Sequence, residues 1–337
     1  MSEKLFITGG AGFIGSNLVK LILRKRPDWQ IINYDGLTYA GNLESLSDIE
    51  GNPNYSFIKG DITDLTAVRS AMSDCTGVLH LAAESHVDRS ILDPGPFLKT
   101  NVIGTQVVLE TARMHNVKRF VQVSTDEVYG SLMQNDPPFT ESHGIDPSSP
   151  YSSSKAGADL LALAYFKTFD LPVIVTRCSN NYGPYQFPEK LLPLVIRNAM
   201  QDIPIPVYGD GQQVRDWIYV EDHCEALLKV YEQGKIGQVY NIGGNSEIAN
   251  LELVKSVLSF LGKNEEMITF VKDRAGHDRR YAIDNSKIKS DLDWEPASHF
   301  KIALRDTVDW YQKETKWINS ILTGEYQSYY ESQYARR

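Results

Sequence analysis

The segment KLFITGGAGFIGSNLVKLI, residues 4–22, decides the fold of this chain. It begins with a short run of β-formers, continues with a glycine-rich turn, and ends with Leu18, Leu21 and Ile22 at a helical period. Glycines in such a turn allow a pyrophosphate to approach the backbone, and free N–H groups at a helix N-terminus favour its charge. The segment therefore predicts a strand, a phosphate-binding turn and a helix.

The next β-type run places an acid where a dinucleotide site needs one. Residues 30–34 lead into Asp35, twenty residues after Gly15. An acid at this spacing binds the adenosine ribose hydroxyls. Its charge would repel a 2′-phosphate and no lysine or arginine lies beside it, so the pattern favours NAD over NADP. The spacing leaves open whether the glycine motif starts at Gly9 or at Gly10.

Strands and helices alternate along the first half of the chain. Further β-type runs lie at residues 55–59, 78–81, 119–124 and 173–177, with helical patterns near residues 64–74, 97–115 and 151–168. This alternation predicts an α/β fold with a Rossmann-type, doubly wound parallel sheet.

From about residue 178 the pattern changes to more prolines and longer irregular connections. We expect residues 1–178 to form a NAD-binding domain and residues 179–330 mainly a smaller mixed α/β lobe that binds substrate. Segments within about 210–245 should return to the first domain, since residues 238–242 form another β-type run. Helical patterns follow near residues 220–233, 250–261 and 301–315, with Asn250 as an N-cap, and residues 327–337 form a polar tail.

Composition limits the possible functions. The 337 residues are 42% hydrophobic and 23% charged, which is typical of a soluble globular protein, and the net charge of −9 argues against binding to nucleic acid or an anionic membrane. Cys75, Cys178 and Cys224 are widely spaced, so we expect a reducing compartment, no disulfide framework and no metal site. No signal peptide and no apolar run of about 18 residues is found, and we expect a cytoplasmic location.

Two stretches carry candidate chemistry: VQVSTDEVYG, residues 121–130, and YSSSK, residues 151–155. Tyr151 and Lys155 lie four residues apart and share a helix face, where the ammonium favours the phenolate of a group with an ordinary pKa of about 10. The pair could accept a hydroxyl proton while a hydride leaves the same carbon. Asp126 and Glu127 supply an acid and a base for a second step.

Each of these signals is weak without a cofactor site. A Tyr-x-x-x-Lys pair is most often a surface pair, and an Asp-Glu pair in a loop is most often solvated charge. His86 ends a β-type run and is more often structural than catalytic at such a position, and its role stays open. Lys190, Arg215 and Arg274 are candidates for binding a diphosphate, because arginine grips phosphate oxygens with two hydrogen bonds.

With residues 8–15, Tyr151 and Lys155, residues 177–184 and residues 273–277 in place, the chain resembles the extended short-chain dehydrogenase/reductases that act on nucleotide sugars. The resemblance covers nearly the whole length. The sequence STDEVYG, residues 124–130, is similar to the signature of the family's 4,6-dehydratases, whereas the related epimerases lack the acid pair. Ala275 departs from the proline that the family often has, which implies a less rigid loop.

The resemblance implies a hydro-lyase reaction on dTDP-glucose that yields the 4-keto-6-deoxy sugar and water, a first step towards deoxysugars such as rhamnose. It implies oxidation at carbon 4 with Tyr151 as the base, elimination across carbons 5 and 6 with Glu127 as base and Asp126 as acid, and return of the hydride to carbon 6. Thr125 would polarise the 4-oxygen. A UDP-sugar 4,6-dehydratase and a nucleotide-sugar 4-epimerase remain alternatives.

Three sets of residues follow from the glycine motif and the resemblance. The catalytic set is Thr125, Asp126, Glu127, Tyr151 and Lys155. The NAD-binding set is Gly9, Gly12, Phe13, Ile14, Gly15, Asp35, Leu37, Thr38, Asp61, Ile62, Leu81, Ala82, Ala83, Ser85, Thr100, Tyr151, Lys155 and Asn181. The nucleotide-sugar set is Ser85, Thr125, Asp126, Glu127, Asn180, Lys190, Leu191, Pro206, Tyr208, Arg215, Asn250, Asp273, Arg274 and His277. The resemblance also implies a homodimer formed through the helices near residues 97–115 and 151–168.

Overall fold

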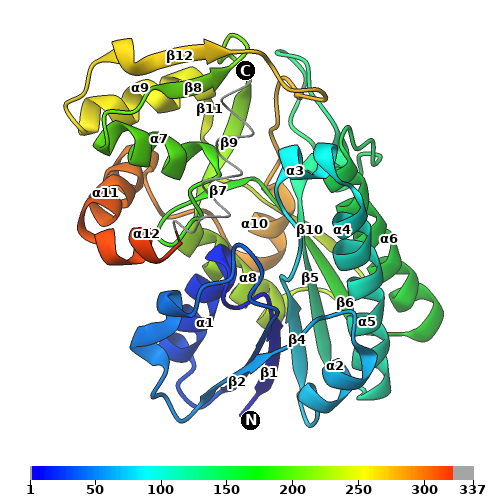
Figure 1. Ribbon diagram of the computed structural model, residues 1–337. Helices are drawn as coiled ribbons and strands as arrows, with labels where there is room; N and C mark the ends of the chain where they lie inside the picture. Colours follow the sequence, from blue (N-terminus) through cyan, green and yellow to red (C-terminus); the bar gives the residue numbers. More distant parts are fainter. Residues whose placement is uncertain (1, 322–337) are drawn as a thin grey trace.

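The computed structural model describes residues 2–321, and at its centre lies a seven-stranded sheet (Figure 1). The strand order is β10-β6-β5-β4-β1-β2-β3, and every neighbouring pair is parallel. Each of the seven β-type runs named above forms one of these strands, so the predicted doubly wound sheet is confirmed. The strands are β1 (Lys4–Thr8), β2 (Gln30–Asp35), β3 (Tyr55–Lys59), β4 (Gly77–His80), β5 (Arg119–Thr125), β6 (Val173–Cys178) and β10 (Val239–Ile242).

Helices cover both faces of this sheet (Figure 1). The helices α1 (Phe13–Lys25) and α8 (Val220–Gln233) pack together on one face, where Leu18, Ile22 and Leu227 are fully buried. The other face is covered by α2 (Leu65–Ala71), α5 (Thr105–Met114) and α6 (Pro150–Phe169). Both faces of the sheet are therefore removed from water, as parallel sheets require.

The helix expected over residues 97–115 is an uninterrupted run of helical elements. It consists of α4 (Gly95–Phe97), a π-helical segment η2 (Leu98–Gly104) and α5. A Cβ at Gly104 would lie 2.5 Å from the side chain of Ile62, so glycine allows the helix to approach this residue closely. Ile62 follows β3 and lines the cavity described below.

The remaining large elements form a second body of structure above the carboxyl edge of the main sheet, here termed the second lobe (Figure 1). Its core contains Leu192, Val254 and Leu304, all nearly inaccessible to solvent. It holds two small sheets, β11-β9-β7 and β12-β8. Its elements are β7 (Asn180–Tyr182), α7 (Leu191–Met200), β8 (Ile205–Tyr208), β9 (Val214–Tyr219), β11 (Glu247–Ala249), α9 (Asn250–Phe260), β12 (Ile268–Val271), α11 (Phe300–Lys313) and α12 (Thr315–Ile321).

The chain crosses from the second lobe back to the main sheet between β9 and α8. β9 pairs with β7 and β11, whereas α8 covers the main sheet and β10 forms its edge. The exact division into two domains near residue 178 stays a prediction. Shorter elements connect these parts: η1 (Leu43–Ile49), α3 (Val87–Leu92), η3 (Asp126–Tyr129), η4 (Glu265–Met267) and α10 (Ser286–Leu292).

The prediction that Asn250 caps a helix is wrong. The residue before α9 is Ala249, which has extended backbone, and Asn250 is already the first helical residue. The chain enters α9 directly from β11, so the extended position falls on the last strand residue. The predicted tail at residues 327–337 lies outside the described residues.

Within residues 2–321 no helix is long and apolar enough to cross a membrane, and no group of His, Cys, Asp and Glu side chains is arranged to hold a metal ion. Cys75, Cys178 and Cys224 are free thiols, and all three are buried. Burial raises the pKa of Cys75 to about 11 and that of Cys178 to about 12. Cys75 and Cys224 therefore behave as small core residues, whereas Cys178 also lines the cavity described below.

An ion pair lies inside the core and joins α6 to β6. Arg177 Nε lies 3.0 Å from Asp159 Oδ2, and the two side chains are 4% and 0% exposed. The Arg177 guanidinium also lies over the ring of Tyr129, 4.6 Å from its centre. Removing one member of such a pair leaves an uncompensated charge in the core.

We predict that Asp159→Asn lowers the free energy of unfolding by about 3–5 kcal/mol, because Arg177 then stays buried without a counter-ion. Urea unfolding followed by circular dichroism measures the change. The double variant Asp159→Asn/Arg177→Met should regain a large part of the loss, since it removes both charges. An Asp159→Asn protein that unfolds at the same urea concentration as the unaltered protein would contradict this account.

Candidate active site

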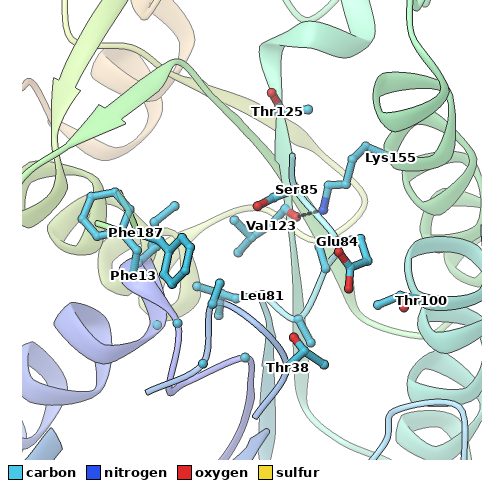
Figure 2. A pocket seen from close by; sticks show the side chains of 18 of the residues that line it. Phe13, Thr38, Leu81, Glu84, Ser85, Thr100, Val123, Thr125, Lys155 and Phe187 are labelled. Carbon is cyan, nitrogen blue, oxygen red and sulfur yellow. Dashed lines mark hydrogen bonds between the residues drawn. The ribbon is translucent and has the colours of Figure 1, made fainter. Parts of the chain in front are cut away.

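A cavity of about 1070 Å³ opens at the carboxyl ends of β1, β2, β4, β5 and β6. The strand order reverses between β1 and β4, and open α/β sheets bind ligands at such a switch point. Figure 2 shows Thr125 and Lys155 towards one end of this cavity and Thr38 towards the other. The cavity wall includes every predicted NAD-binding residue except Leu37, and it includes the whole catalytic set.

The glycine turn at the end of β1 lies directly against the end of β4. Gly9 has a φ of 72°, and a Cβ there would lie 2.7 Å from the backbone nitrogen of Ala82. A Cβ at Gly15 would collide with the carbonyl oxygen of Gly9, whose partner in the turn is the Gly12 N–H at 3.2 Å. Gly10 instead faces the side chain of Asn33. A Cβ at Gly10 would lie 2.2 Å from Asn33 Oδ1, so Gly9, Gly10 and Gly15 all lack room for a side chain and both readings of the motif stay open.

Asp35 ends β2 at the far end of the cavity. Its carboxylate accepts hydrogen bonds from the backbone N–H groups of Ala11, at 2.9 Å, and Leu37, at 2.8 Å. Burial raises the pKa of Asp35, and these two hydrogen bonds act against that shift. Each carboxylate oxygen keeps capacity for a further donor. Leu37 packs against the core beside α1 and contacts Asp35 through its backbone, which explains its absence from the cavity wall.

The predicted acid pair lies where β5 turns into η3. The Thr125 hydroxyl accepts a hydrogen bond from the Glu127 N–H at 3.2 Å and donates to Asp126 Oδ1 at 3.3 Å. Asp126 is 2% exposed, and Oδ2 of its carboxyl group has no hydrogen-bond partner among the described residues. This local geometry orients the carboxyl group of Asp126 and the backbone of Glu127.

The two carboxyl groups have different surroundings. Burial raises the pKa of Asp126 well above its ordinary value, and the negative charges of Glu127 and Asp216 raise it further. Burial also raises the pKa of Glu127, but the cationic groups of Arg274, Lys190 and Arg215 act against this. The arrangement favours a protonated Asp126 beside an ionised Glu127.

Tyr151 and Lys155 lie on the face of α6 that points into the cavity. The helix begins at Pro150, after Ser149 and Ser152 form a reciprocal capping box. The Lys155 ammonium donates to the carbonyl oxygen of Val123 at 2.7 Å (Figure 2). Both side chains are buried, at 8% and 6% exposure.

The expected lowering of the Tyr151 pKa by Lys155 is not what this geometry gives. Burial raises the pKa of Tyr151 well above its ordinary value, and the charge of Glu127 adds to the rise. Burial lowers the pKa of Lys155, which Asp159 partly offsets. The physical reason is that desolvation opposes the charged form of both groups.

Some of the predicted nucleotide-sugar residues line the cavity, whereas others lie outside its wall. The Lys190 ammonium donates to the carbonyl oxygen of Ser85 at 2.6 Å, and Lys190 and Asn180 line the cavity. Arg215 donates to the carbonyl oxygens of Val214 and Asp278. The predicted nucleotide-sugar residues that do not line this cavity are Leu191, Pro206, Tyr208, Arg215, Asn250, Asp273, Arg274 and His277.

Several of these residues are joined to each other. The His277 ring bonds to the Asp273 carboxylate at 2.5 Å, and it meets the Tyr208 ring edge to face. Burial lowers the pKa of His277 to about 4. The Tyr208 hydroxyl donates to Asp88 at 2.7 Å, and Arg274 lies 3.8 Å from the same carboxylate. Asp88 therefore connects Tyr208 with Arg274, two residues of the predicted substrate site.

His86 has a structural environment. It precedes α3, where its Nδ1 accepts from the Arg89 N–H at 3.4 Å, and its Nε2 lies 3.4 Å from the carbonyl oxygen of Glu189. Burial lowers its pKa well below the ordinary value. A neutral, buried ring at a helix start supports the structural alternative for this residue.

Sequence reasoning missed three polar residues that organise the site. Asn101 binds both the N–H and the carbonyl of Glu84, at 2.8 and 2.9 Å. Asp216 accepts from the N–H groups of Gly244 and Ser246, at 2.8 and 2.6 Å. Asp88 is the third. Each bonds to a residue distant in the sequence, so no local pattern marks it.

The chain matches the family model described as GDP-mannose 4,6 dehydratase over residues 6–307. It is 49% identical to a dTDP-glucose 4,6-dehydratase of Salmonella typhimurium, over 99% of both chains. Among solved structures it is similar to a dTDP-glucose 4,6-dehydratase of Bacillus anthracis in complex with NAD, with a TM-score of 0.89 and 49% identity over 95% of this chain and 100% of that chain.

The enzyme of the same name from Streptomyces venezuelae, solved with NAD bound, has a TM-score of 0.92 and 44% identity over 94% of this chain and 99% of that chain. These relatives and the family model agree on the fold and on the reaction class. The chain therefore belongs to the GDP-mannose 4,6 dehydratase family of extended short-chain dehydrogenase/reductases, and within it to the group of the dTDP-glucose 4,6-dehydratases.

Proposed function

We propose that this protein is an NAD-dependent hydro-lyase that converts dTDP-glucose to dTDP-4-keto-6-deoxyglucose and water. The observation that carries the proposal is the acid pair: Asp126 and Glu127 lie in one cavity with Tyr151, and their surroundings favour opposite protonation states. An acid and a base side by side are what elimination of water needs.

The residues at the carboxyl edge of the sheet fit NAD. The turn at Gly9 and Gly15 has no room for side chains, and Gly12 precedes the thirteen-residue helix α1 without a side-chain cap. The N–H groups of the first turn are thus available to a pyrophosphate. Asp35 would hold the ribose hydroxyls. When bound, NAD supplies an acceptor for the hydride of carbon 4 and later returns this hydride to carbon 6.

The chain's own residues carry the proton transfers. Tyr151 takes the proton of the sugar 4-hydroxyl, and Lys155, one turn farther along α6, lines the same cavity. Thr125 polarises the 4-oxygen. The resulting ketone acidifies the hydrogen on carbon 5, which Glu127 removes. Asp126 donates its proton to the departing 6-hydroxyl, so water leaves across carbons 5 and 6, and a proton then returns to carbon 5.

Lys190, Arg215 and Arg274 are the groups we assign to the substrate diphosphate. All three charges act on Glu127, which supports their assignment to one bound ligand. Arg215 is 4% exposed and lies over the ring of Tyr281, 4.3 Å from its centre, so its direction is fixed. A fixed guanidinium suits phosphate oxygens. The remaining predicted nucleotide-sugar residues are assigned to the same ligand.

An epimerase on this scaffold would need Tyr151 and the cofactor but no acid pair. Asp126 is nevertheless buried with a carboxyl oxygen that has no described partner, a costly arrangement for a group without a task. This observation favours dehydration over epimerisation. A UDP sugar remains the second substrate candidate, because the acid pair acts on the hexose and not on the base.

The acid pair gives the decisive prediction. Glu127→Gln should still oxidise the sugar but stall before the carbon 5 proton is lost, so NADH absorbance builds up and no deuterium enters from heavy water. Asp126→Asn should slow elimination while some carbon 5 exchange continues. Each defect should be about two to four powers of ten, the usual contribution of a general acid or base.

Tyr151→Phe is the matched control, because it should prevent oxidation and give neither NADH absorbance nor exchange. Near-normal turnover by either acid variant, or formation of the 4-epimer by the unaltered protein, would refute the dehydratase assignment. Parallel assays with dTDP-glucose and UDP-glucose distinguish the two substrates.

We predict that the unaltered protein binds NAD much more tightly than NADP, and that Asp35→Asn reduces this preference, since it removes the charge that repels a 2′-phosphate. Titration calorimetry with both dinucleotides measures the ratio. Glu50→Gln, which changes an exposed carboxylate outside the cavity, should leave it unchanged. Equal affinity of the unaltered protein for both dinucleotides would rule out the assigned role of Asp35.

We also propose a cytoplasmic homodimer. Large apolar side chains are exposed on adjoining helices: Leu98 and Ile103 on η2 are each 54% exposed, and Leu160 on α6 is 57% exposed. Such a face favours association with a second copy. The three buried thiols suit a reducing compartment.

Leu160→Glu should convert the dimer to a monomer, because it would bury a charge in the contact. Light scattering after gel filtration gives the mass. Ile302→Glu is the matched control, since Ile302 on α11 is 63% exposed but lies in the second lobe. A monomeric unaltered protein would exclude the proposed contact.

A further inference from the structure

The loop that follows β2 joins two separate parts of the molecule. Thr38, Ala40 and Gly41 line the cavity beyond Asp35. Tyr39, between them, does not line it but packs with Ala40 against the core of the second lobe. We term residues 36–46 the strap.

Tyr39 meets side chains from two other segments. Its ring contacts the Phe187 ring edge to face, with 5.6 Å between centres. The Arg89 guanidinium lies over the same ring at 4.2 Å and pairs with Glu189 at 3.1 Å. Phe187 and Glu189 both line the cavity from the segment that leads into α7. Tyr39 therefore links the two sides of the cavity.

A second attachment lies farther along the strap. Trp317 of α12 donates from its indole nitrogen to the Ser45 hydroxyl at 2.9 Å. Asn42 donates from its amide to the Ser320 hydroxyl at 3.1 Å, and its backbone N–H binds the carbonyl of Ala11 at 2.9 Å. The strap is thus fixed to the glycine turn on one side and to the second lobe on the other.

We propose that Tyr39 is a positioning residue that retains the dinucleotide by holding the strap against Phe187 and Arg89. This inference rests on the proposed NAD-dependent function. The overall reaction returns the cofactor to its starting oxidation state, so catalysis needs no exchange of cofactor between turnovers. Contacts that slow the release of the dinucleotide from the adenosine end of the cavity therefore do not lower the turnover rate.

The test measures cofactor release directly. The protein is loaded with NAD labelled in the adenine ring, excess unlabelled NAD is added, and the label that stays on the protein is followed with time. Tyr39→Ala should release the label about tenfold faster or more, equivalent to about 1.4 kcal/mol, because both ring contacts are lost. Tyr39→Phe keeps the ring but loses the hydroxyl that bonds to Ser85 and Glu189, so its release rate should lie between those of the unaltered protein and Tyr39→Ala.

Phe270→Ala is the matched control, since it also removes an aromatic ring from the second lobe, 57% exposed and away from the cavity. Its release rate should be unchanged. If Tyr39 and Phe187 act together, the double variant Tyr39→Ala/Phe187→Leu should accelerate NAD release by less than the product of the accelerations in the two single variants.

Release from Tyr39→Ala at the unaltered rate would overturn the inference, and so would equal acceleration by Phe270→Ala, which indicates general loosening. If Tyr39→Ala does not fold, Tyr39→Leu keeps apolar packing without the ring and should still accelerate release. An unaltered protein that binds no NAD would refute the proposed function itself, and the two failures are thus distinguishable.

Discussion

A chain of buried hydrogen bonds holds the central strands in the register on which the site depends. The Thr8 hydroxyl lies 2.6 Å from Nδ1 of His80 and accepts from the N–H groups that begin the next loop, at Leu81 and Ala82. Nε2 of the same imidazole lies 3.0 Å from Thr105. Burial lowers the pKa of His80 to about 3, so the ring stays neutral and links β1, β4 and α5 without adding a charge. Because it fixes where β4 ends, it also fixes how closely the glycine turn approaches.

The acid pair shows how one dipeptide acquires two chemical roles. Asp126 and Glu127 are neighbours and share the charge of Arg215, yet the other charges that act on them differ. Asp216 on β9 opposes ionisation of Asp126, whereas Lys190, Arg215 and Arg274 support ionisation of Glu127. Burial is the largest cause of both pKa shifts; the main sheet supplies the pair, and residues of the second lobe add several of the charges. The contact between the two parts therefore influences the protonation states of both acids.

Much of this arrangement could be predicted from the sequence. The strands could be predicted because buried parallel strands consist of runs of β-formers. The dinucleotide site could be predicted because the distance from Gly15 to Asp35 is that between a phosphate-binding turn and a ribose-binding acid. The roles of Asp88 and Asp216 could not be predicted, since their partners lie far away in the chain. The N-cap was wrongly assigned to Asn250, because asparagine is a strong N-cap residue. In the structure β11 extends to Ala249, so Ala249 takes the N-cap position and Asn250 is the first helical residue. The hydrogen bond from Lys155 to Val123 could not be predicted either, because it depends on how closely α6 packs against β5.

Helix α6 has an unusual distribution of side chains. Its buried face carries Tyr151, Lys155 and Asp159, whereas Leu160 and Phe169 are exposed to solvent. In an isolated subunit, therefore, reactive and charged side chains of α6 are buried, and large apolar side chains of the same helix are exposed. If the outer face is covered by a second copy, each side of the helix has a task, and few positions along it are free to vary. A random mutagenesis screen for activity would then find α6 among the least tolerant segments of the chain, with losses that arise from two unrelated causes on its two sides.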